Sequence, residues 1–335
     1  MIHAYAATEV GGELKPFEYD PGELAHDGVE IEISHCGVCH SDLSMLENQW
    51  GFSSFPMVPG HEVIGTVSAL GEHVTHLSVG QRVGLGWFSG SCMSCHQCMS
   101  GSHNLCSNSE STIVGRYGGF ADRVRTHWSW AVPLPETLDP TKAGPLFCGG
   151  ITVFGPMLEY GVKPTDRVGV VGIGGLGHMA LQFLNKWGCE VFAFSSNPDK
   201  ADEAKAFGAH KVVNSRDPKS FQELNGALDF LLVTANVDLD WGAYLSTLAP
   251  KGRLHFVGAV PSPLSVHVHQ MLSKQTQISS SPLGSPAQLS LMLEFCARHG
   301  ILPQTETFGL SEVNDAMAHL KAGKARYRIV LDVSR

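Results

Sequence analysis

The chain lacks long apolar runs, an excess of basic residues and any low-complexity segment. No apolar run reaches the ~18 residues that a membrane-spanning helix needs. Asp and Glu total 32 against 23 Lys and Arg, giving a formal net charge of −9, and the acidic residues are scattered rather than grouped. Such a charge balance disfavours binding to phosphate backbones and anionic lipid. We therefore expect neither nucleic acid nor a membrane as a partner.

A secretion signal is also lacking. Met1–Ala6 shows no basic stretch followed by an apolar run, so we expect no signal peptide. The chain has nine cysteines, and without secretion they are expected to be reduced thiols. Clustered thiols in a reducing compartment indicate metal. We expect a cytoplasmic protein.

The chain is expected to form two domains, because 335 residues exceed one ordinary core. Hydrophobic residues make up 43% and the mean hydropathy is +0.01, as in a globular protein. Up to residue 147 the chain is β-rich and irregular. From there strands alternate with helices, which predicts a parallel, doubly wound sheet. Its six strands are expected at 167–172, 191–194, 211–214, 229–233, 253–258 and 277–280. Beyond 285 we expect helices at 287–298 and 312–321 and a strand at 327–331.

A loop rich in Ser and Gly carries four cysteines with metal-site spacing. Cys92, Cys95, Cys98 and Cys106 are separated by two, two and seven residues. Four thiolates at this spacing suit tetrahedral zinc, although related spacings also serve iron–sulfur clusters. Four protein ligands leave no open position, so the metal would be structural.

A second set of metal-binding residues is dispersed along the chain. Cys36–Asp42 carries two thiols, a hydroxyl and a carboxylate, and Gly60-His61-Glu62 adds an imidazole and another carboxylate. A catalytic zinc takes three protein ligands and keeps one position open. Cys39 and His61 are two soft ligands. Cys148 is the best candidate for the third, with a small buried core thiol as the alternative.

A glycine-rich turn follows the first strand of the alternating series. It satisfies the dinucleotide-binding fingerprint, because it comes after an apolar strand and opens a helix. Glycines there let the backbone approach a pyrophosphate at the helix N-terminus. A tight turn without a ligand is the alternative. The residues concerned are Gly172, Gly174, Gly175, Leu176 and Gly177.

The end of the second strand favours NADP over NAD. NAD-binding domains place Asp or Glu there to bind the ribose 2′-hydroxyl. This chain instead has Ser195-Ser196-Asn197, with Lys200 shortly beyond. Hydroxyls, an amide and an ammonium group suit a phosphate dianion, whereas the alternative is a simple polar loop.

These segments together resemble the zinc-dependent medium-chain alcohol dehydrogenases, most closely their cinnamyl-alcohol-dehydrogenase-like branch, which includes bacterial aldehyde reductases. The resemblance spans essentially the whole chain. It is carried by Cys36–Asp42, Pro59–Val63, the four-cysteine loop, Leu146–Thr152, Val170–His178, Ser195–Lys200 and Arg326–Arg328.

The resemblance implies a fold and an assembly. Residues 1–147 and 286–335 would form a GroES-like catalytic domain. Residues 148–285 would form a Rossmann domain with a six-stranded parallel sheet that binds NADP(H). A homodimer paired through the nucleotide-binding domains is implied as well.

The resemblance also assigns the metal ligands. The catalytic zinc would be held by Cys39, His61 and Cys148, with Glu62 as a transient fourth ligand and Cys36 not bound. The four-cysteine loop would hold a second, structural zinc. We therefore expect two zinc ions per chain.

The implied reaction is reversible hydride transfer between NADP(H) and a primary alcohol or aldehyde, with zinc polarising the carbonyl. Ser41 would bond the substrate oxygen and pass its proton, and Asp42 would orient the imidazole of His61. Thr152 is expected near the nicotinamide. His40 and Arg328 are expected near the cofactor phosphates.

Two departures from the family matter. Many relatives have a histidine at the position of Ser44 to pass the proton to solvent, and serine does not hold a proton near neutral pH. We expect this step to be slower or more pH-dependent here. The connection 106–118 is also shorter than in bacterial relatives, which leaves the pocket lining open. Its candidates, each equally consistent with ordinary core, are Trp50, Phe52, Phe88, Tyr117 and Leu283. They favour aromatic or medium aliphatic aldehydes.

Two rival functions are weighed against this one. An NAD-dependent dehydrogenase of polyols or short alcohols would use the same zinc, but its sequence would be expected to have an acidic residue after the second strand. A non-catalytic zinc- and NADPH-binding sensor is expected to have lost a catalytic ligand, and Cys39, His61 and Cys148 are all present. A zinc-free quinone reductase would lack both cysteine sets.

Overall fold

A computed structural model describes residues 1–335, which divide into two compact units. The first unit comprises Met1–Ile151 and Leu283–Arg335, and the second comprises Thr152–Pro282. The boundaries expected at 147/148 and 285/286 thus lie at 151/152 and 282/283. The first shift has a local cause. The 3₁₀ turn η3 (Gly144–Phe147) lies against strands of the first unit, so that the next residue, Cys148, stays with that unit.

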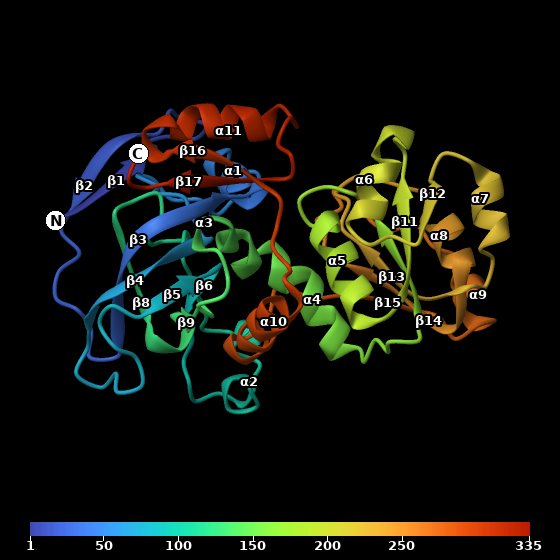
Figure 1. Cartoon of the computed structure of the whole chain (residues 1–335), viewed down its shortest axis with the longest axis horizontal. Helices are drawn as coiled ribbons and strands as arrows, with labels where there is room; N and C mark the ends of the chain where they lie inside the picture. The colour runs from blue at the N-terminus through green and yellow to red at the C-terminus, as the bar shows by residue number, and fades with distance from the viewer. The chain divides into compact units, whose positions relative to one another are not determined.

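The first unit is β-rich, and its main sheet has seven strands (Figure 1). The strand order is β16-β17-β3-β4-β5-β9, with β8 also pairing β3. The pairs are antiparallel except β16 with β17. Two small sheets, β1-β2 and β6-β7, complete the unit. Its strands are β1 (Ile2–Ala6), β2 (Lys15–Tyr19), β3 (Gly28–Val38), β4 (Val63–Leu70), β5 (Arg82–Leu85), β6 (Phe88–Gly90), β7 (Glu110–Ser111), β8 (Arg123–His127), β9 (Val132–Pro133), β16 (Thr305–Gly309) and β17 (Arg328–Asp332).

Helices in this unit are few and mostly short. The amphipathic stretches expected near the C-terminus form α10 and α11, and α10 begins with a capping box in which Ser285 and Gln288 bond each other's backbone N–H. The helices are α1 (His40–Leu46), α2 (His96–Met99), α3 (Pro140–Ala143), α10 (Pro286–His299) and α11 (Val313–Lys321), with 3₁₀ turns η1 (His103–Leu105), η2 (Trp128–Trp130) and η5 (Leu310–Glu312).

The second unit is a six-stranded parallel sheet in the order β12-β11-β10-β13-β14-β15, as predicted. Its central strands are buried apolar runs, because helices cover both faces. The strands are β10 (Arg167–Val171), β11 (Glu190–Ser195), β12 (Lys211–Asn214), β13 (Leu228–Val233), β14 (Leu248–Phe256) and β15 (Gln277–Ser280). The helices are α5 (Gly177–Trp187), α6 (Ala201–Ala206), α7 (Pro218–Glu223), α8 (Trp241–Thr247) and α9 (Val268–Leu272), with the turn η4 (Pro198–Lys200).

Some elements depart from the expectation. Helix α4 (Gly149–Glu159) contains three glycines and Pro156, which conceal it in the sequence. Strand β14 begins at Leu248, five residues before the strand expected at 253–258. Both departures come from burial. Most residues of α4 are buried, and so is Leu248, and tertiary packing overrides a weak local propensity. No helix combines the length and apolar character needed to cross a bilayer.

Candidate functional site

Four predicted metal ligands meet inside the first unit. Cys39 is the N-cap of α1, and His61 and Glu62 directly precede β4. Cys148 follows η3. All four are buried, and one donor atom from each lies within 4.8 Å of all the others. The long-range packing of the sheet therefore brings together residues that lie far apart in the sequence.

The separations between these donor atoms suit one tetrahedral ion. His61 Nε2 lies 3.3 Å from Cys148 Sγ, and the sulfurs of Cys39 and Cys148 are 3.9 Å apart. Zinc bonds of 2.0–2.3 Å at tetrahedral angles place ligand atoms roughly 3.3–3.8 Å apart. Contact with Cys148 lowers the pKa of the Cys39 thiol well below its usual range, which favours the thiolate that zinc binds.

Asp42 fixes the orientation of His61. Its carboxylate is fully buried and accepts hydrogen bonds from the backbone N–H groups of Cys39 (2.9 Å) and Gly60 (2.8 Å). Its Oδ1 also lies 2.9 Å from His61 Nδ1. Burial works against charge on His61, but Asp42 raises the imidazole pKa well above its usual range. A carboxylate at Nδ1 keeps Nε2 directed toward the thiols, as in carboxylate–histidine–zinc arrangements.

Glu62 points at the same centre from the other side. Its Oε1 pairs with Arg328 Nη2, whereas its Oε2 is buried without a hydrogen-bond partner. Burial raises the pKa of the carboxyl to about 7 in spite of Arg328. A Cβ on Gly37 would lie 2.0 Å from Oε2, so only glycine admits this carboxylate. The unsatisfied oxygen beside two thiols and an imidazole fits a bound zinc.

Arg328, predicted near the cofactor phosphates, lies beside the metal-binding group. Its side chain is 7% exposed and its guanidinium is paired with Glu62. Strand β17 lies beside β3, which carries the chain into Cys39. That pairing places Arg328 behind the metal ligands of the first unit.

The four-cysteine loop forms a second cluster. Sulfur–sulfur separations from 3.5 to 4.0 Å link Cys92, Cys95, Cys98 and Cys106, and all four are free thiols. Backbone N–H groups of Ser94 and Cys95 lower the pKa of the Cys92 thiol to about 6. The arrangement fits a tetrahedral four-sulfur zinc. Cys36 belongs to neither cluster: its buried thiol faces the Gly37 carbonyl.

The glycine turn of the second unit joins β10 to α5 as expected. Gly172 has a φ of +93°, and a Cβ on Gly177 would lie 2.0 Å from the Gly172 carbonyl oxygen. A Cβ on Gly174 would meet nothing within 4 Å, so the space in front of the turn is open. Gly175 and Leu176 complete the turn before α5. This cradle fits a pyrophosphate at the helix N-terminus.

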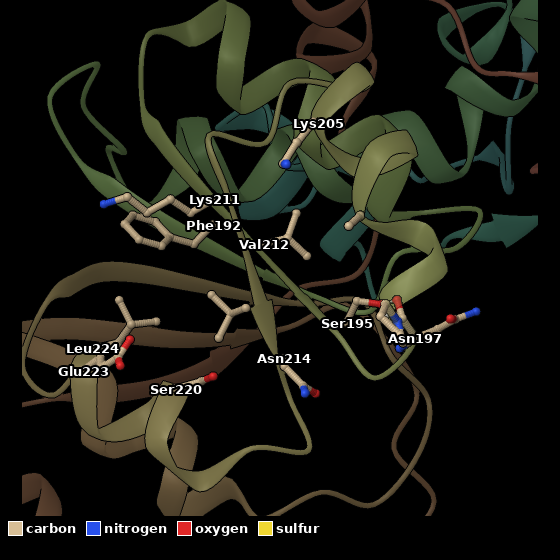
Figure 2. A pocket seen from close by; sticks show the side chains of 13 residues that line it. Phe192, Ser195, Asn197, Lys205, Lys211, Val212, Asn214, Ser220, Glu223 and Leu224 are labelled. Carbon is tan, nitrogen blue, oxygen red and sulfur yellow. Dashed lines mark hydrogen bonds between the residues drawn. The ribbon is translucent and has the colours of Figure 1, made fainter.

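The residues expected at a 2′-phosphate lie at the end of β11. Ser195 is half-buried and its hydroxyl donates to the Asn197 carbonyl (3.0 Å), whereas Ser196 is exposed. Lys200 donates to the Ile173 carbonyl at 2.9 Å, which ties this segment to the glycine turn. A cavity of about 520 Å³ opens beside this segment (Figure 2). Its polar lining consists of Ser195, Asn197, Lys205, Lys211, Asn214, Ser220 and Glu223, and apolar residues complete it. None of the metal-cluster residues lines this cavity.

A row of aromatic rings leads away from His61. The Trp87 ring lies edge-on to the His61 imidazole with centroids 5.0 Å apart. Trp50 lies 5.8 Å from Trp87 and also 5.8 Å from Phe52. Trp50 and Phe52 are 39% and 51% exposed. The row therefore runs from a buried metal ligand to the surface.

The other pocket candidates lie elsewhere. Phe88 is core and packs on Trp130, and Tyr117 packs on Phe17 and Tyr19. Leu283 packs against the core of the first unit. Trp87 was missed by the sequence analysis. Its only signal is its place beside the pocket candidate Phe88, two residues after the end of β5.

The remaining predicted residues are placed as follows. Ser41 Oγ lies 3.8 Å from Cys39 Sγ, beside the metal ligands. His40 is exposed at the start of α1. Thr152 is almost buried and is the first residue of the second unit. Ser44, also in α1, donates to Gln49 Oε1 at 2.9 Å.

Comparison with known proteins identifies both units. Residues 25–136 match the family model "Alcohol dehydrogenase GroES-like domain", and residues 175–298 match "Zinc-binding dehydrogenase". The chain is 56% identical to the aldehyde reductase AdhA of Synechocystis, over all of both chains. It is 35% identical to a probable cinnamyl alcohol dehydrogenase of Oryza sativa, covering 98% of this chain and 94% of the relative.

Solved structures agree with these sequence matches. A cinnamyl alcohol dehydrogenase from Sorghum bicolor superposes with a TM-score of 0.95 at 34% identity, covering 99% of this chain and 98% of that one. A Helicobacter pylori relative, solved in complex with NADP(H), gives 0.91 at 27% identity, with 100% and 98% coverage.

Proposed function

Because the chain belongs to the zinc-dependent medium-chain alcohol dehydrogenase family, in its cinnamyl-alcohol-dehydrogenase-like branch, we propose that it reduces aldehydes with NADPH and runs the reverse oxidation with NADP⁺. The first unit is the catalytic domain and the second binds the cofactor. The observation that carries the proposal is the buried group of Cys39, His61 and Cys148 with Asp42 behind the imidazole.

The metal is assigned to residues that converge in the first unit. Cys39, His61 and Cys148 hold the catalytic ion, and Glu62 is close enough to replace a solvent ligand. When bound, zinc supplies a Lewis acid for the substrate oxygen. Asp42 keeps the imidazole tautomer correct, and the buried surroundings exclude competing water ligands. The four-cysteine loop holds the second, structural zinc.

Ser41 is assigned to the substrate proton. Its hydroxyl lies beside Cys39 Sγ, within the same turn of chain as the metal ligands. A hydroxyl there donates to the oxygen that gains charge during reduction and accepts from the alcohol during oxidation. Ser44 follows one helical turn later on α1.

The cofactor is assigned to the second unit. The open turn at Gly172, Gly174 and Gly177 supports binding of a pyrophosphate, and Ser195, Ser196 and Lys200 support binding of a 2′-phosphate. NADPH, once bound, supplies the hydride. The neutral, hydroxyl-rich end of β11 carries no carboxylate that would repel a phosphate. Thr152 is assigned to the nicotinamide side and His40 to the phosphates.

The aromatic row supports the substrate class. Trp87, Trp50 and Phe52 offer flat apolar surface from His61 outward, and ring faces favour aromatic or medium aliphatic aldehydes. The related aldehyde reductase and cinnamyl alcohol dehydrogenases carry names consistent with this class.

A homodimer in the cytoplasm completes the proposal. Helix α9 exposes Val268 and Leu272 at 66% and 70%, and Val237 and Leu264 are exposed in the same unit. Exposed apolar side chains of this kind are typical of a covered interface. None of the nine cysteines forms a disulfide, which supports a reducing compartment.

One experiment tests the central claim. Purified protein is screened for NADPH and NADH oxidation over aromatic and aliphatic aldehydes, and zinc is measured on the same sample. We expect about two zinc per chain, activity with aromatic aldehydes and a lower KM for NADPH than for NADH. A single zinc, absence of activity with every aldehyde, or a KM ratio favouring NADH would contradict the proposal. The variant Ser195→Asp, which introduces a negative charge, is expected to shift the ratio toward NADH.

A further inference from the structure

Three consecutive carbonyl groups of the glycine turn each accept a hydrogen bond from a side chain of the second unit. The donors belong to three separate segments: the residue after β13, the last residue of η4 and the second residue of α5. The bonds are Thr234 Oγ1 to Gly172 (2.7 Å), Lys200 Nζ to Ile173 (2.9 Å) and His178 Nδ1 to Gly174 (3.1 Å). We name the three donors the carbonyl-holding residues.

Two of these carbonyl groups depend on side chains alone. No backbone N–H donates to the carbonyl of Gly172 or of Ile173. The Thr234 hydroxyl also lies 3.0 Å from the Val171 carbonyl, but that carbonyl already accepts the Thr234 N–H at 3.0 Å. The single hydroxyl proton therefore serves the shorter contact with Gly172.

His178 holds the third carbonyl from a buried position. Its side chain is fully enclosed, and its ring packs edge-on against Phe207 with centroids 5.3 Å apart. A carbonyl oxygen only accepts hydrogen bonds, so Nδ1 carries the proton in this contact. The packing leaves the ring little freedom to turn away from the Gly174 carbonyl.

Holding a carbonyl group also fixes the N–H group of the next residue. A trans peptide unit is planar, and its C=O and N–H bonds point in opposite directions. The three held carbonyls therefore set the directions of the N–H groups of Ile173, Gly174 and Gly175. None of these three N–H groups has an acceptor in the chain. They are directed away from the protein groups that hold the turn.

From this arrangement we propose that Thr234, Lys200 and His178 are positioning residues for the cofactor. They hold the turn so that its N–H groups already point at the pyrophosphate before NADP(H) arrives. Donors that are oriented in advance lower the cost of ordering the site on binding. This inference rests on the proposed binding of NADP(H) to the second unit.

Lys200 has a second consequence, because it is also assigned to the 2′-phosphate. An ammonium group carries three N–H donors, so one side chain can bond the Ile173 carbonyl and a phosphate together. Lys200 then links the pyrophosphate turn to the end of β11. Loss of its ammonium group is expected to weaken binding of NADH as well as NADPH, although NADH has no 2′-phosphate.

The test is fluorescence titration of NADPH and of NADH into the zinc-loaded protein without substrate. Thr234→Val keeps the shape of the side chain but removes the hydroxyl, and it is expected to raise both Kd values about tenfold. The ratio of the two Kd values stays that of the wild type. Thr234→Ser restores the hydroxyl and is expected to restore both affinities.

The other two positions give different patterns. Lys200→Met is expected to raise the Kd for NADH about tenfold and that for NADPH about 100-fold or more, because a charge-assisted contact is lost as well. His178→Leu is expected to raise both Kd values equally, and His178→Asn, whose amide N–H lies near the Nδ1 position, is expected to raise them less. Ser196→Ala is expected to affect NADPH alone.

The matched control is Thr247→Val. The Thr247 hydroxyl also donates to a buried backbone carbonyl, that of Tyr244 at 2.7 Å, but within α8 and away from the turn. This variant is expected to bind both cofactors as the wild type does. Equal weakening in Thr247→Val and Thr234→Val would overturn the proposal, because it would indicate general loosening of the second unit.

The remaining outcomes separate this inference from the proposed function. A wild-type protein that binds neither cofactor would contradict both. Normal binding by the wild type and by Thr234→Val would overturn the positioning role alone. Lys200 is only half-buried, so Lys200→Met tests the proposal even where Thr234→Val does not fold. A rise in Kd for NADPH only in Lys200→Met would overturn the link between the turn and the 2′-phosphate.

Discussion

Arg328 and Glu62 form a buried ion pair across 266 residues of chain, directly beside the ligand His61. The guanidinium contacts one oxygen of the Glu62 carboxyl, and the second oxygen is buried without a hydrogen-bond partner. Nothing in the local sequence of β17 signals this contact. It couples the C-terminal strand to the catalytic centre.

Breaking this pair on one side is expected to destabilise the protein strongly. Glu62→Gln leaves the buried Arg328 charge uncompensated, which costs about 3–5 kcal/mol of unfolding free energy. The double variant Glu62→Gln/Arg328→Met removes both charges and is expected to cost less than Glu62→Gln alone. Urea unfolding of Glu62→Gln, Arg328→Met, the double variant and the wild type measures this. A double variant that costs the sum of the single changes would show that the two side chains act independently.

The two metal centres are expected to separate by mutation. Cys95→Ser removes a ligand of the four-cysteine cluster, so zinc falls from about two to one per chain and the thermal midpoint falls. Cys148→Ser also removes one zinc but abolishes aldehyde reduction. Cys36→Ser, at a buried thiol outside both clusters, is the matched control and is expected to keep both ions. Loss of zinc in Cys36→Ser would contradict the ligand assignment.

Shortening the aromatic row is expected to change substrate preference. Trp50→Ala removes apolar surface near the metal ligands, so the KM for aromatic aldehydes is expected to rise about tenfold, equivalent to ~1.4 kcal/mol, while that for acetaldehyde changes little. Phe17→Ala is the control, because its ring packs on Tyr19 and Tyr117 instead. Equal changes for both aldehydes would argue against a substrate contact.

His255 is expected to make stability depend on pH. It is fully buried between the hydroxyls of Ser279 (2.9 Å) and Ser281 (3.0 Å), and burial, assisted by Arg253, lowers its pKa from 6.5 to about 4. Between these values the unfolded chain binds a proton that the folded chain refuses, so stability falls as the pH drops from 6.5 to about 4, by about 3 kcal/mol in total. Above pH 6.5 the group contributes no slope.

The variant His255→Gln isolates this effect. It has no titrating group, so the difference in unfolding free energy from the wild type is expected to change across this pH window and to be constant above it. The sign matters: the unfolding free energy of the wild type minus that of His255→Gln is expected to rise as the pH rises across this window, and a fall would mean that the folded protein holds the imidazolium.

Proton release is expected to respond to Ser44. Ser44 donates to Gln49, which donates to Glu47 at 2.6 Å, and Glu47 pairs with Lys321. A carboxamide does not take up a proton near neutral pH, so this chain of bonds stops at Gln49. Ser44→His introduces an imidazole, which does take up a proton near neutral pH. The rate of alcohol oxidation is therefore expected to depend less on pH and to increase toward lower pH. The increase is expected to stay within the roughly 10²-fold effect of a general base. Ser44→Ala is the control. An unchanged profile in Ser44→His would contradict a role in proton release.

Much of the fold could be predicted because its signals are local. The run Arg167–Val171, the glycine turn and α5 follow one another in the sequence, so alternation of apolar strands and helices predicts the parallel sheet directly. The four-cysteine spacing likewise lies within one loop. In both cases the partners are near neighbours in the chain, and composition with spacing contains the relevant information.

The sequence by itself determined which chemical groups are present: two sets of metal-binding side chains, a glycine turn and a neutral end of β11. Tertiary structure decided which of them meet. It kept Cys148 with the first unit through η3 and paired Arg328 with Glu62. It also placed Trp87 beside His61. The reason is physical: these contacts depend on strand pairing and burial between distant segments, and no local propensity or spacing encodes them.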